Sequence, residues 1–247
     1  MQDEDGSRIG EAEPTTSHSR VSLRRGASIG CAGNDRPGSA QVAVTPAAGA
    51  TVLSMSATLP LTGEPEADEL LASDPLALMI GMLLDQQFPM ERAFVAPYRL
   101  RERLGGRLDA AEIATTPPDE LEAVFRTPPA LHRFHGSMAR RTQALCQYLV
   151  DHYGGDASAL WKDVESGAEL LRRVRALPGF GEQKAKIFCA LLAKRFGITP
   201  AGWQEATRPY SDDQPRSVAD IDSPDALERV RAWKRTMRAQ RDNKAGD

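Results

Sequence analysis

The segment Leu177-Pro178-Gly179-Phe180-Gly181, followed by Glu182–Ala185, has the spacing with the clearest chemical meaning. Pro178 ends the helix before it, while Gly179 and Gly181 permit positive φ and leave backbone N–H groups unobstructed. These groups stand at the N-terminus of the next helix, where the helix dipole attracts anions. The pattern predicts a phosphate site made by Gly179, Phe180, Gly181, Gln183 and Lys184. A plain corner between two helices is the alternative.

The elements that position this segment are helices, because apolar residues from residue 58 onward recur at helical spacing without the alternation of a strand. Asp74-Pro75 supplies an N-cap and a first helical residue. The helix that follows is apolar on every face up to Leu84 and must therefore be buried. Residues 198–222 are polar and irregular. We expect an all-α domain of about eight helices. Its other helices begin near Met90, Thr116, Ser137, Ala168, Glu182 and Ser223.

Residues 1–57 differ in composition from the rest of the chain. They contain no Phe, Tyr or Trp, and 24 of them are Gly, Ala or Ser. Such a segment cannot bury enough apolar surface to offset its loss of conformational entropy. We therefore expect residues 1–57 to be a disordered tail and residues 58–247 to form the fold. A later start of translation at Met55 is an alternative explanation of this composition.

Several classes of protein are excluded by composition. No run of eighteen apolar residues exists, and the N-terminus lacks the apolar stretch of a secretory signal. Cys31, Cys146 and Cys189 have neither the spacing of a disulfide framework nor that of a zinc or iron–sulfur site. His132 and His135 alone do not make a metal site and are interpreted as structural or solvent-exposed. We expect a cytoplasmic monomer without membrane contact, metal or cofactor.

Charge is unevenly distributed along the fold. Residues 58–137 carry 7 basic and 13 acidic side chains, whereas residues 168–247 carry 16 basic and 11 acidic ones. This bias favours a polyanion as partner, with ordinary scatter on solvated helices as the alternative. The polar side of the last helix contains Arg229, Arg231, Lys234, Arg235, Arg238 and Arg241.

These features resemble the HhH-GPD superfamily of base-excision-repair DNA glycosylases, and its compact bacterial branch in particular. The resemblance covers about residues 60–240. It includes the hairpin, its two helices at about 168–196, and the buried helix that ends in Leu84-Asp85-Gln86-Gln87. The resemblance implies a two-lobed helical fold with a central cleft. It also implies a double-stranded DNA partner whose damaged or mismatched base is flipped out and released.

The resemblance also implies roles for single residues. Gln183 stands where lyase-competent members have the Lys that attacks the sugar, so an enzyme of this sequence would lack lyase activity. The family's catalytic Asp has no counterpart in Ile198–Trp203. A carboxylate is nonetheless expected to stabilise the oxocarbenium-like transition state. We rank Glu205 first and Asp85 second as catalytic candidates. Asp212 and Asp213 are further acidic candidates of the same stretch.

Four polar or aromatic residues are candidates for contact with bases. Gln86 and Gln87 can fill the gap that a flipped base leaves, or they can simply cap the end of a helix. Trp203 and Tyr210 can stack on the everted base, or they can anchor a loop. The resemblance also implies that the chain bends DNA. Some members carry an iron–sulfur loop, and this chain lacks the cysteines for it after residue 197.

Two functions therefore remain open from the sequence. The first is a monofunctional DNA glycosylase, which hydrolyses the N-glycosidic bond of a damaged or mismatched base. The second is a non-catalytic protein that binds a lesion or an unusual DNA structure with the same scaffold. An RNA- or protein-binding helical module is a third, less specific interpretation.

Overall fold

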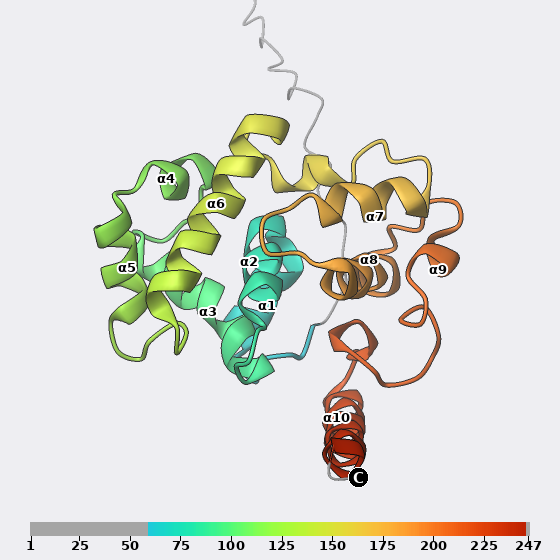
Figure 1. The fold of residues 1–247 in the computed structure, drawn as a ribbon. Coiled ribbons are helices and arrows are strands. Elements are labelled where there is room, and N and C mark those ends of the chain that lie inside the picture. Colours follow the sequence, from blue (N-terminus) through green and yellow to red (C-terminus); the bar gives the residue numbers. More distant parts are fainter. Residues whose placement is uncertain (1–58, 246–247) are drawn as a thin grey trace, which may run out of the picture. The chain divides into compact units, whose positions relative to one another are not determined.

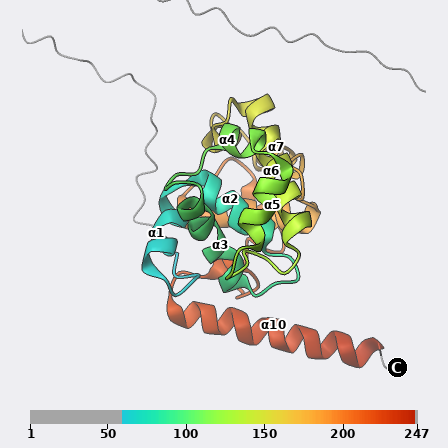
Figure 2. The ribbon, with the colours of Figure 1, turned by 90° about the vertical axis from the view of Figure 1, so that its left-hand side faces the viewer.

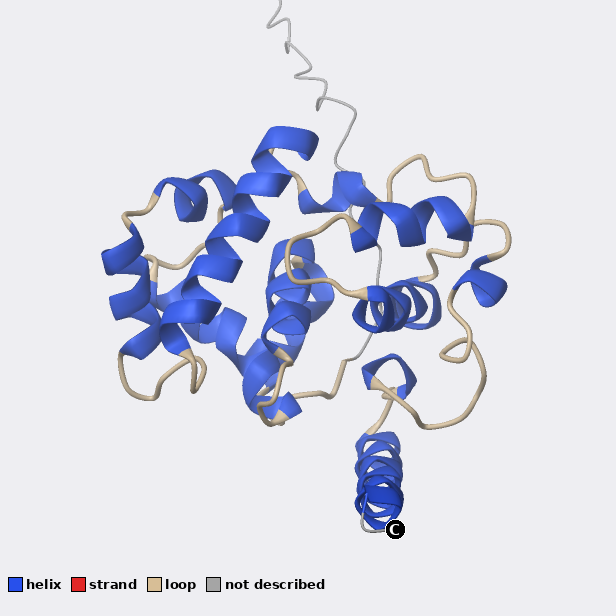
Figure 3. Cartoon of the chain, viewed as in Figure 1, coloured by secondary structure: helices blue, strands red, loops and turns tan. Residues whose placement is uncertain are grey.

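The structure, a computed structural model, describes the backbone of residues 59–245 and the side chains of residues 59–240. Every regular element in this range is a helix, which confirms the all-α prediction (Figures 1 and 3). The expected disordered tail, residues 1–57, lies outside the described residues. The α-helices are α1 (Pro65–Ser73), α2 (Pro75–Leu84), α3 (Met90–Arg103), α4 (Ala110–Thr115), α5 (Pro118–Arg126), α6 (His135–Tyr153), α7 (Gly167–Arg175), α8 (Glu182–Phe196), α9 (Trp203–Ala206) and α10 (Pro224–Ala245).

Ten α-helices are thus described where the sequence predicted about eight, and that number was wrong. The 3-10 helices η1 (Ala157–Leu160) and η2 (Val218–Asp220) complete the set. The sequence predicted no helix at the positions of α1, α4 and α9. α4 and α9 have six and four residues, which is too short for an apolar period to be visible. α9 and η2 also lie in the stretch predicted to be wholly irregular.

The buried helix α2 was predicted correctly, including its start. Asp74 Oδ1 accepts hydrogen bonds from the backbone N–H groups of Leu76 and Ala77, at 2.8 and 3.1 Å, and Pro75 is the first helical residue. All nine residues from Leu76 to Leu84 are buried. α1 and α3 pack against α2, and α6 and η1 also contact it. This burial fixes the position of the turn that follows α2.

Two groups of helices lie on either side of α1–α3 in Figure 1. The first group consists of α4, α5 and α6, in which α6 contacts the other two. The second consists of α7, α8, α9 and η2, in which α8 contacts each of the others. α10 contacts η2 and runs along the edge of the molecule in Figure 2. Within the described residues, none of these helices has the length and apolar content needed to span a membrane.

Candidate functional site

The hairpin between α7 and α8 is a type II turn. The backbone N–H of Phe180 donates to Leu177 O at 3.1 Å, with Pro178 and Gly179 in the two central positions. Gly179 has φ of +83°, as the third position of this turn requires and as the sequence predicted. A Cβ at Gly179 would lie 2.4 Å from Leu83 Cδ1. The turn therefore packs directly on the end of α2.

Gly181 has a different reason to be glycine. It is the N-cap of α8 with φ −76° and ψ 173°, a conformation open to every residue type, so positive φ holds at Gly179 and not at Gly181. A Cβ at Gly181 would meet nothing within 4 Å. Because Gly181 has no Cβ, there is space in front of the N–H groups of residues 181–184. These N–H groups have no hydrogen-bond partner among the described residues. This is the geometry of an anion site at a helix N-terminus.

The side chains of the hairpin contribute less to this site than its backbone does. Phe180 is buried and packs edge-on against Phe188, with ring centroids 5.7 Å apart. Gln183 is exposed. Glu182, the acidic residue of the first turn, is paired with Arg175 at 2.9 Å and with Lys186 at 3.1 Å. These two cations offset the negative charge that would otherwise repel a phosphate.

Lys184 extends inward, to the C-terminus of α2. Its Nζ donates to Met82 O at 2.7 Å and to Leu83 O at 2.8 Å, two carbonyls at the helix end that lack helical partners. Burial lowers the pKa of Lys184 to about 8, against the opposing effect of the nearby Asp85. Only the backbone N–H of Lys184 is therefore placed to meet a phosphate at the hairpin.

Asp85 is the C-cap of α2, and its backbone N–H donates to Gly81 O at 3.1 Å. Its partly buried carboxylate makes no hydrogen bond or ion pair with any described residue. Burial raises the pKa of Asp85, whereas the positive charges of Lys234 and Lys184 lower it. The turn after α2 thus holds a partly buried carboxylate that has no hydrogen-bond partner among the described residues and lies within reach of the charges of two lysines.

Gln86 and Gln87 follow directly and are both held by arginines. Gln86 Oε1 accepts from Arg141 at 2.7 Å, and Gln87 Oε1 accepts from Arg133 at 2.9 Å. Gln87 has φ of +49°, a left-handed conformation that is uncommon for a residue other than glycine. Local strain of this kind gathers at functional sites. Sequence reasoning found the two glutamines but not the arginines, which lie about fifty residues away.

His132 connects this turn to the start of α6. Its Nε2 donates to Gln86 O at 3.1 Å, and its Nδ1 accepts the N–H of Phe134 at 3.0 Å, so these partners assign a neutral ring. Burial lowers the pKa of His132, which agrees with that assignment. The side chain is fully buried, so of the two interpretations from sequence the structural one is correct.

A hollow of about 430 Å³ lies where the turn after α2 meets α6. It is lined by Gln86, Gln87, Phe134, Ser137, Met138 and Arg141. Phe134 is 47% exposed, and the guanidinium of Arg133 lies 4.4 Å from its ring centroid. An exposed aromatic ring beside two amides and two arginines can stack on a base. Sequence reasoning missed Phe134, because an exposed Phe and a buried one look alike in a sequence.

The remaining sequence candidates lie elsewhere, around α9. Glu205 has a side chain that is 73% exposed and is paired with Arg208 at 3.1 Å. Trp203 lies against α7, where a Cβ on Gly167 would be 2.4 Å from Trp203 Cα. Tyr210 is partly buried against the core. None of these three residues lines the hollow beside Gln86, and α9 contacts α7 and α8.

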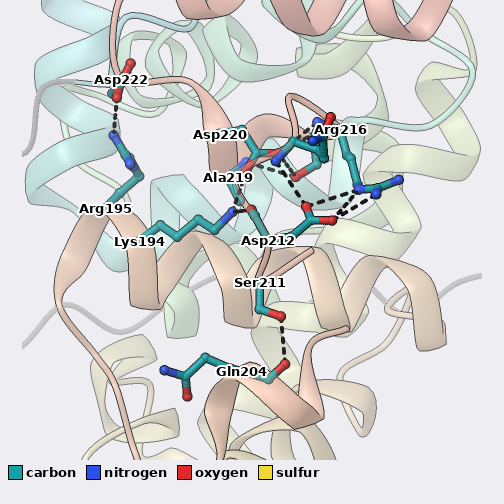
Figure 4. A network of polar contacts seen from close by, with 11 residues as sticks. Lys194, Arg195, Gln204, Ser211, Asp212, Arg216, Ala219, Asp220 and Asp222 are labelled. Atoms are coloured by element: carbon teal, nitrogen blue, oxygen red, sulfur yellow. Dashed lines mark hydrogen bonds and ion pairs between the residues drawn. The ribbon is translucent and has the colours of Figure 1, made fainter. Parts of the chain in front are cut away.

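The other acidic residues of this stretch are structural or exposed. Asp212 forms an ion pair with Arg216 at 2.8 Å, and this hydrogen-bonded partner lowers the pKa of the carboxyl group (Figure 4). Asp213 is exposed. Asp220 pairs with Lys194 of α8 at 2.6 Å (Figure 4). These contacts fasten the segment after α9 to α8.

No group of three or more His, Cys, Asp or Glu that could hold a metal ion occurs in the described part of the chain. The iron–sulfur cluster carried by some helix-hairpin-helix glycosylases does not fit this sequence. Such clusters need four cysteines, and the chain has three, with none after Cys189. Burial raises the pKa of both Cys146 and Cys189 to about 12, so both thiols are protonated.

Comparison with known proteins agrees with this geometry. Residues 80–245 match the family described as HhH-GPD superfamily base excision DNA repair protein. The match spans more than half of the chain, and the chain belongs to this family. Membership implies DNA as the binding partner. Neither a curated protein nor a solved structure matches the chain.

Proposed function

We propose that this protein is a monofunctional DNA glycosylase that hydrolyses the N-glycosidic bond of a damaged or mismatched base in double-stranded DNA. The observation that carries the proposal is the unpartnered carboxylate of Asp85 at the end of the buried helix, on which the positive charges of Lys184 and Lys234 act. The same turn leads into Gln86 and Gln87, and the hairpin packs on the same helix end.

Asp85 would act on the sugar during cleavage. As the base departs, positive charge develops on the sugar ring, and a nearby carboxylate stabilises that charge or takes a proton from the attacking water. Desolvation strengthens this interaction because the effective dielectric around the carboxylate is low. We prefer Asp85 to Glu205, because Glu205 is solvated and already paired with Arg208.

The absence of lyase chemistry is part of the proposal. Gln183, at the position of the family's nucleophilic Lys, has an amide that cannot form a Schiff base. The neighbouring Lys184 directs its amine at two backbone carbonyls. The product would therefore be an intact strand with an abasic site.

DNA would be held by two surfaces. The free N–H groups at the N-terminus of α8 bind a backbone phosphate without reading sequence. Gln86, Gln87 and Phe134 occupy the gap that the flipped base leaves, with hydrogen bonds from the amides and stacking from the ring. Trp203 and Tyr210 stay candidates for contact with the everted base, although neither lines the hollow beside Gln86.

A non-catalytic lesion-binding protein is the second candidate. It is favoured by one observation, the lack of a carboxylate in Ile198–Trp203, where the family has its catalytic Asp. Both candidates share the hairpin and the DNA partner, so only turnover separates them.

The test is a base-release assay on duplexes that carry a panel of damaged and mismatched bases, with and without alkali. We expect strand cleavage only after alkali, and a rate at least about 10²-fold lower for Asp85→Asn. Glu205→Gln is the matched control, with the same loss of one carboxylate, and should retain the wild-type rate. Cleavage without alkali would overturn the monofunctional assignment. Binding without release from any duplex would favour the second candidate.

A further inference from the structure

The middle of α10 is strongly cationic. Residues 229–240 include five Arg or Lys and no Asp or Glu. At 3.6 residues per turn, four of the five share one face of the helix, and Arg229 lies on the opposite face. The shared face, called here the basic face of α10, consists of Arg231, Lys234, Arg235 and Arg238.

The basic face begins beside the candidate catalytic carboxylate. Arg231 pairs with Glu91 at 2.7 Å, and Lys234 Nζ lies 3.7 Å from Met90 Sδ, both at the start of α3. The positive charge of Lys234 also acts on Asp85, which lies five residues before Met90 in the sequence. The N-terminal part of the basic face, Arg231 and Lys234, is therefore held next to the turn that carries Asp85.

The C-terminal part of the basic face has no acidic partner among the described side chains. Arg235 and Arg238 are exposed and form no ion pair with any residue whose side chain is described. Figure 2 shows the C-terminal end of α10 clear of the other helices. Four cations in about two helical turns, with only Arg231 neutralised by acidic partners, favour a polyanionic ligand over a single anion.

The apolar side of α10 argues against a lipid surface as that ligand. Val230 is buried, and Trp233 is partly buried with the guanidinium of Arg216 5.2 Å from its ring centroid. A helix that binds in a bilayer interface needs an exposed apolar face to insert between lipids. Here the large apolar side chain next to the basic face is already covered by Arg216.

We propose that the basic face of α10 binds the DNA backbone, as a second phosphate contact in addition to the hairpin. This inference rests on the proposed function, since the DNA is the substrate duplex. From Arg231 to Arg238 the helix rises about 10 Å, which corresponds to about three base-pair steps of B-DNA. The duplex would extend from the Asp85 site along α10, and the contact would add affinity without sequence preference.

The experiment measures the affinity of the full chain for a fluorescent duplex as a function of salt. Each phosphate contact contributes about 0.9 to the slope of log K against log salt concentration. We expect Arg235→Gln and Arg238→Gln to lower the slope by about 1 each, and the double variant by about 2. Arg229→Gln is the matched control on the opposite face of the same helix and should leave the slope unchanged.

The possible outcomes separate this inference from the proposed function. If the wild-type chain binds no duplex, the proposed function fails together with the inference. If the wild type binds and releases base but the double variant keeps the wild-type slope, the inference alone is overturned. Binding to phosphatidylserine vesicles that the double variant loses, with an unchanged DNA slope, would overturn it in favour of a lipid surface.

Discussion

Two lysines of α8, Lys184 and Lys194, each lie near an aspartate. The two sites differ in whether the lysine and the aspartate pair with each other. Lys194 and Asp220 form a closed pair at 2.6 Å, with side chains 12% and 7% exposed. The Asp220 carboxylate also accepts the N–H groups of Arg216 and Ser217 (Figure 4). Lys184 instead directs its ammonium at carbonyls of α2 and leaves the carboxylate of Asp85 without a partner.

The presence or absence of a hydrogen-bond partner distinguishes a structural carboxylate from a candidate catalytic one. A carboxylate whose two oxygens both accept hydrogen bonds from the protein holds the fold together and is not available to a substrate. A partly buried carboxylate without a partner reduces stability unless a ligand completes it. We therefore assign Asp220 to the fold and propose Asp85 for the chemistry, although both are aspartates near a lysine of the same helix.

The largest expected effect that tests this comparison is on stability. Asp220→Asn leaves Lys194 buried without its counter-ion and should lower the free energy of unfolding by about 3–5 kcal/mol. Asp85→Asn removes an unpartnered charge and should change it by less than about 1 kcal/mol. Urea denaturation followed by circular dichroism measures both values. Equal losses in the two variants would contradict the assignment of separate roles.

The two hairpin glycines should show the same contrast with a smaller effect. Gly179→Ala forces a side chain into positive φ and against Leu83, so we expect about 1–3 kcal/mol less stability. Gly181→Asp places a good N-cap residue in open space, so the stability should hold or rise by a few tenths of a kcal/mol. Its carboxylate would occupy the anion site and repel phosphate.

We therefore expect Gly181→Asp to lower the affinity for duplex DNA by at least about tenfold, the equivalent of one charge-assisted hydrogen bond. Fluorescence anisotropy at fixed salt measures this affinity. Unchanged DNA binding in Gly181→Asp would show that the N-terminus of α8 does not contact phosphate.

The smallest expected effect is the pH dependence that Lys184 imposes. Because its pKa is about 8, the ammonium loses its proton as the pH rises through 8, and the neutral amine donates weaker hydrogen bonds to the two α2 carbonyls beside the turn that carries Asp85. Base release should then fall a few-fold between pH 7.5 and about 9. Lys184→Arg keeps the charge, so its rate should stay level over this range. A decline that is identical in the two proteins would exclude Lys184 as its cause.

A loss of stability caused by Lys184 cannot account for this fall in base release. The pKa of Lys184 is lower in the folded state than its usual value of 10.5, so between pH 8 and 10.5 the unfolded chain binds more protons. The contribution of Lys184 to the free energy of unfolding therefore rises with pH in that range. Activity and this contribution to stability should move in opposite directions.

Much of the fold could be predicted from the sequence, because local rules determine it. The cap at Asp74, the buried run after it, and the turn at Gly179 each depend on a few adjacent residues, and all three were predicted correctly. The helices α1, α4 and α9 were missed; in α4 and α9, four to six residues show no apolar period. The family was also recognisable from these local patterns, and the match over residues 80–245 agrees.

Which residues come together in the candidate site depends on the tertiary structure. Sequence reasoning ranked Glu205 above Asp85 by its position after the hairpin helix, a ranking that stays untested, whereas the structure shows which of the two carboxylates is solvated. Lys184 reaches Met82 across 102 residues of chain, and no spacing rule connects the two. Capping and turns arise from bonds between neighbours along the chain. The desolvation and charge that prepare a carboxylate for chemistry come from groups that only folding brings together.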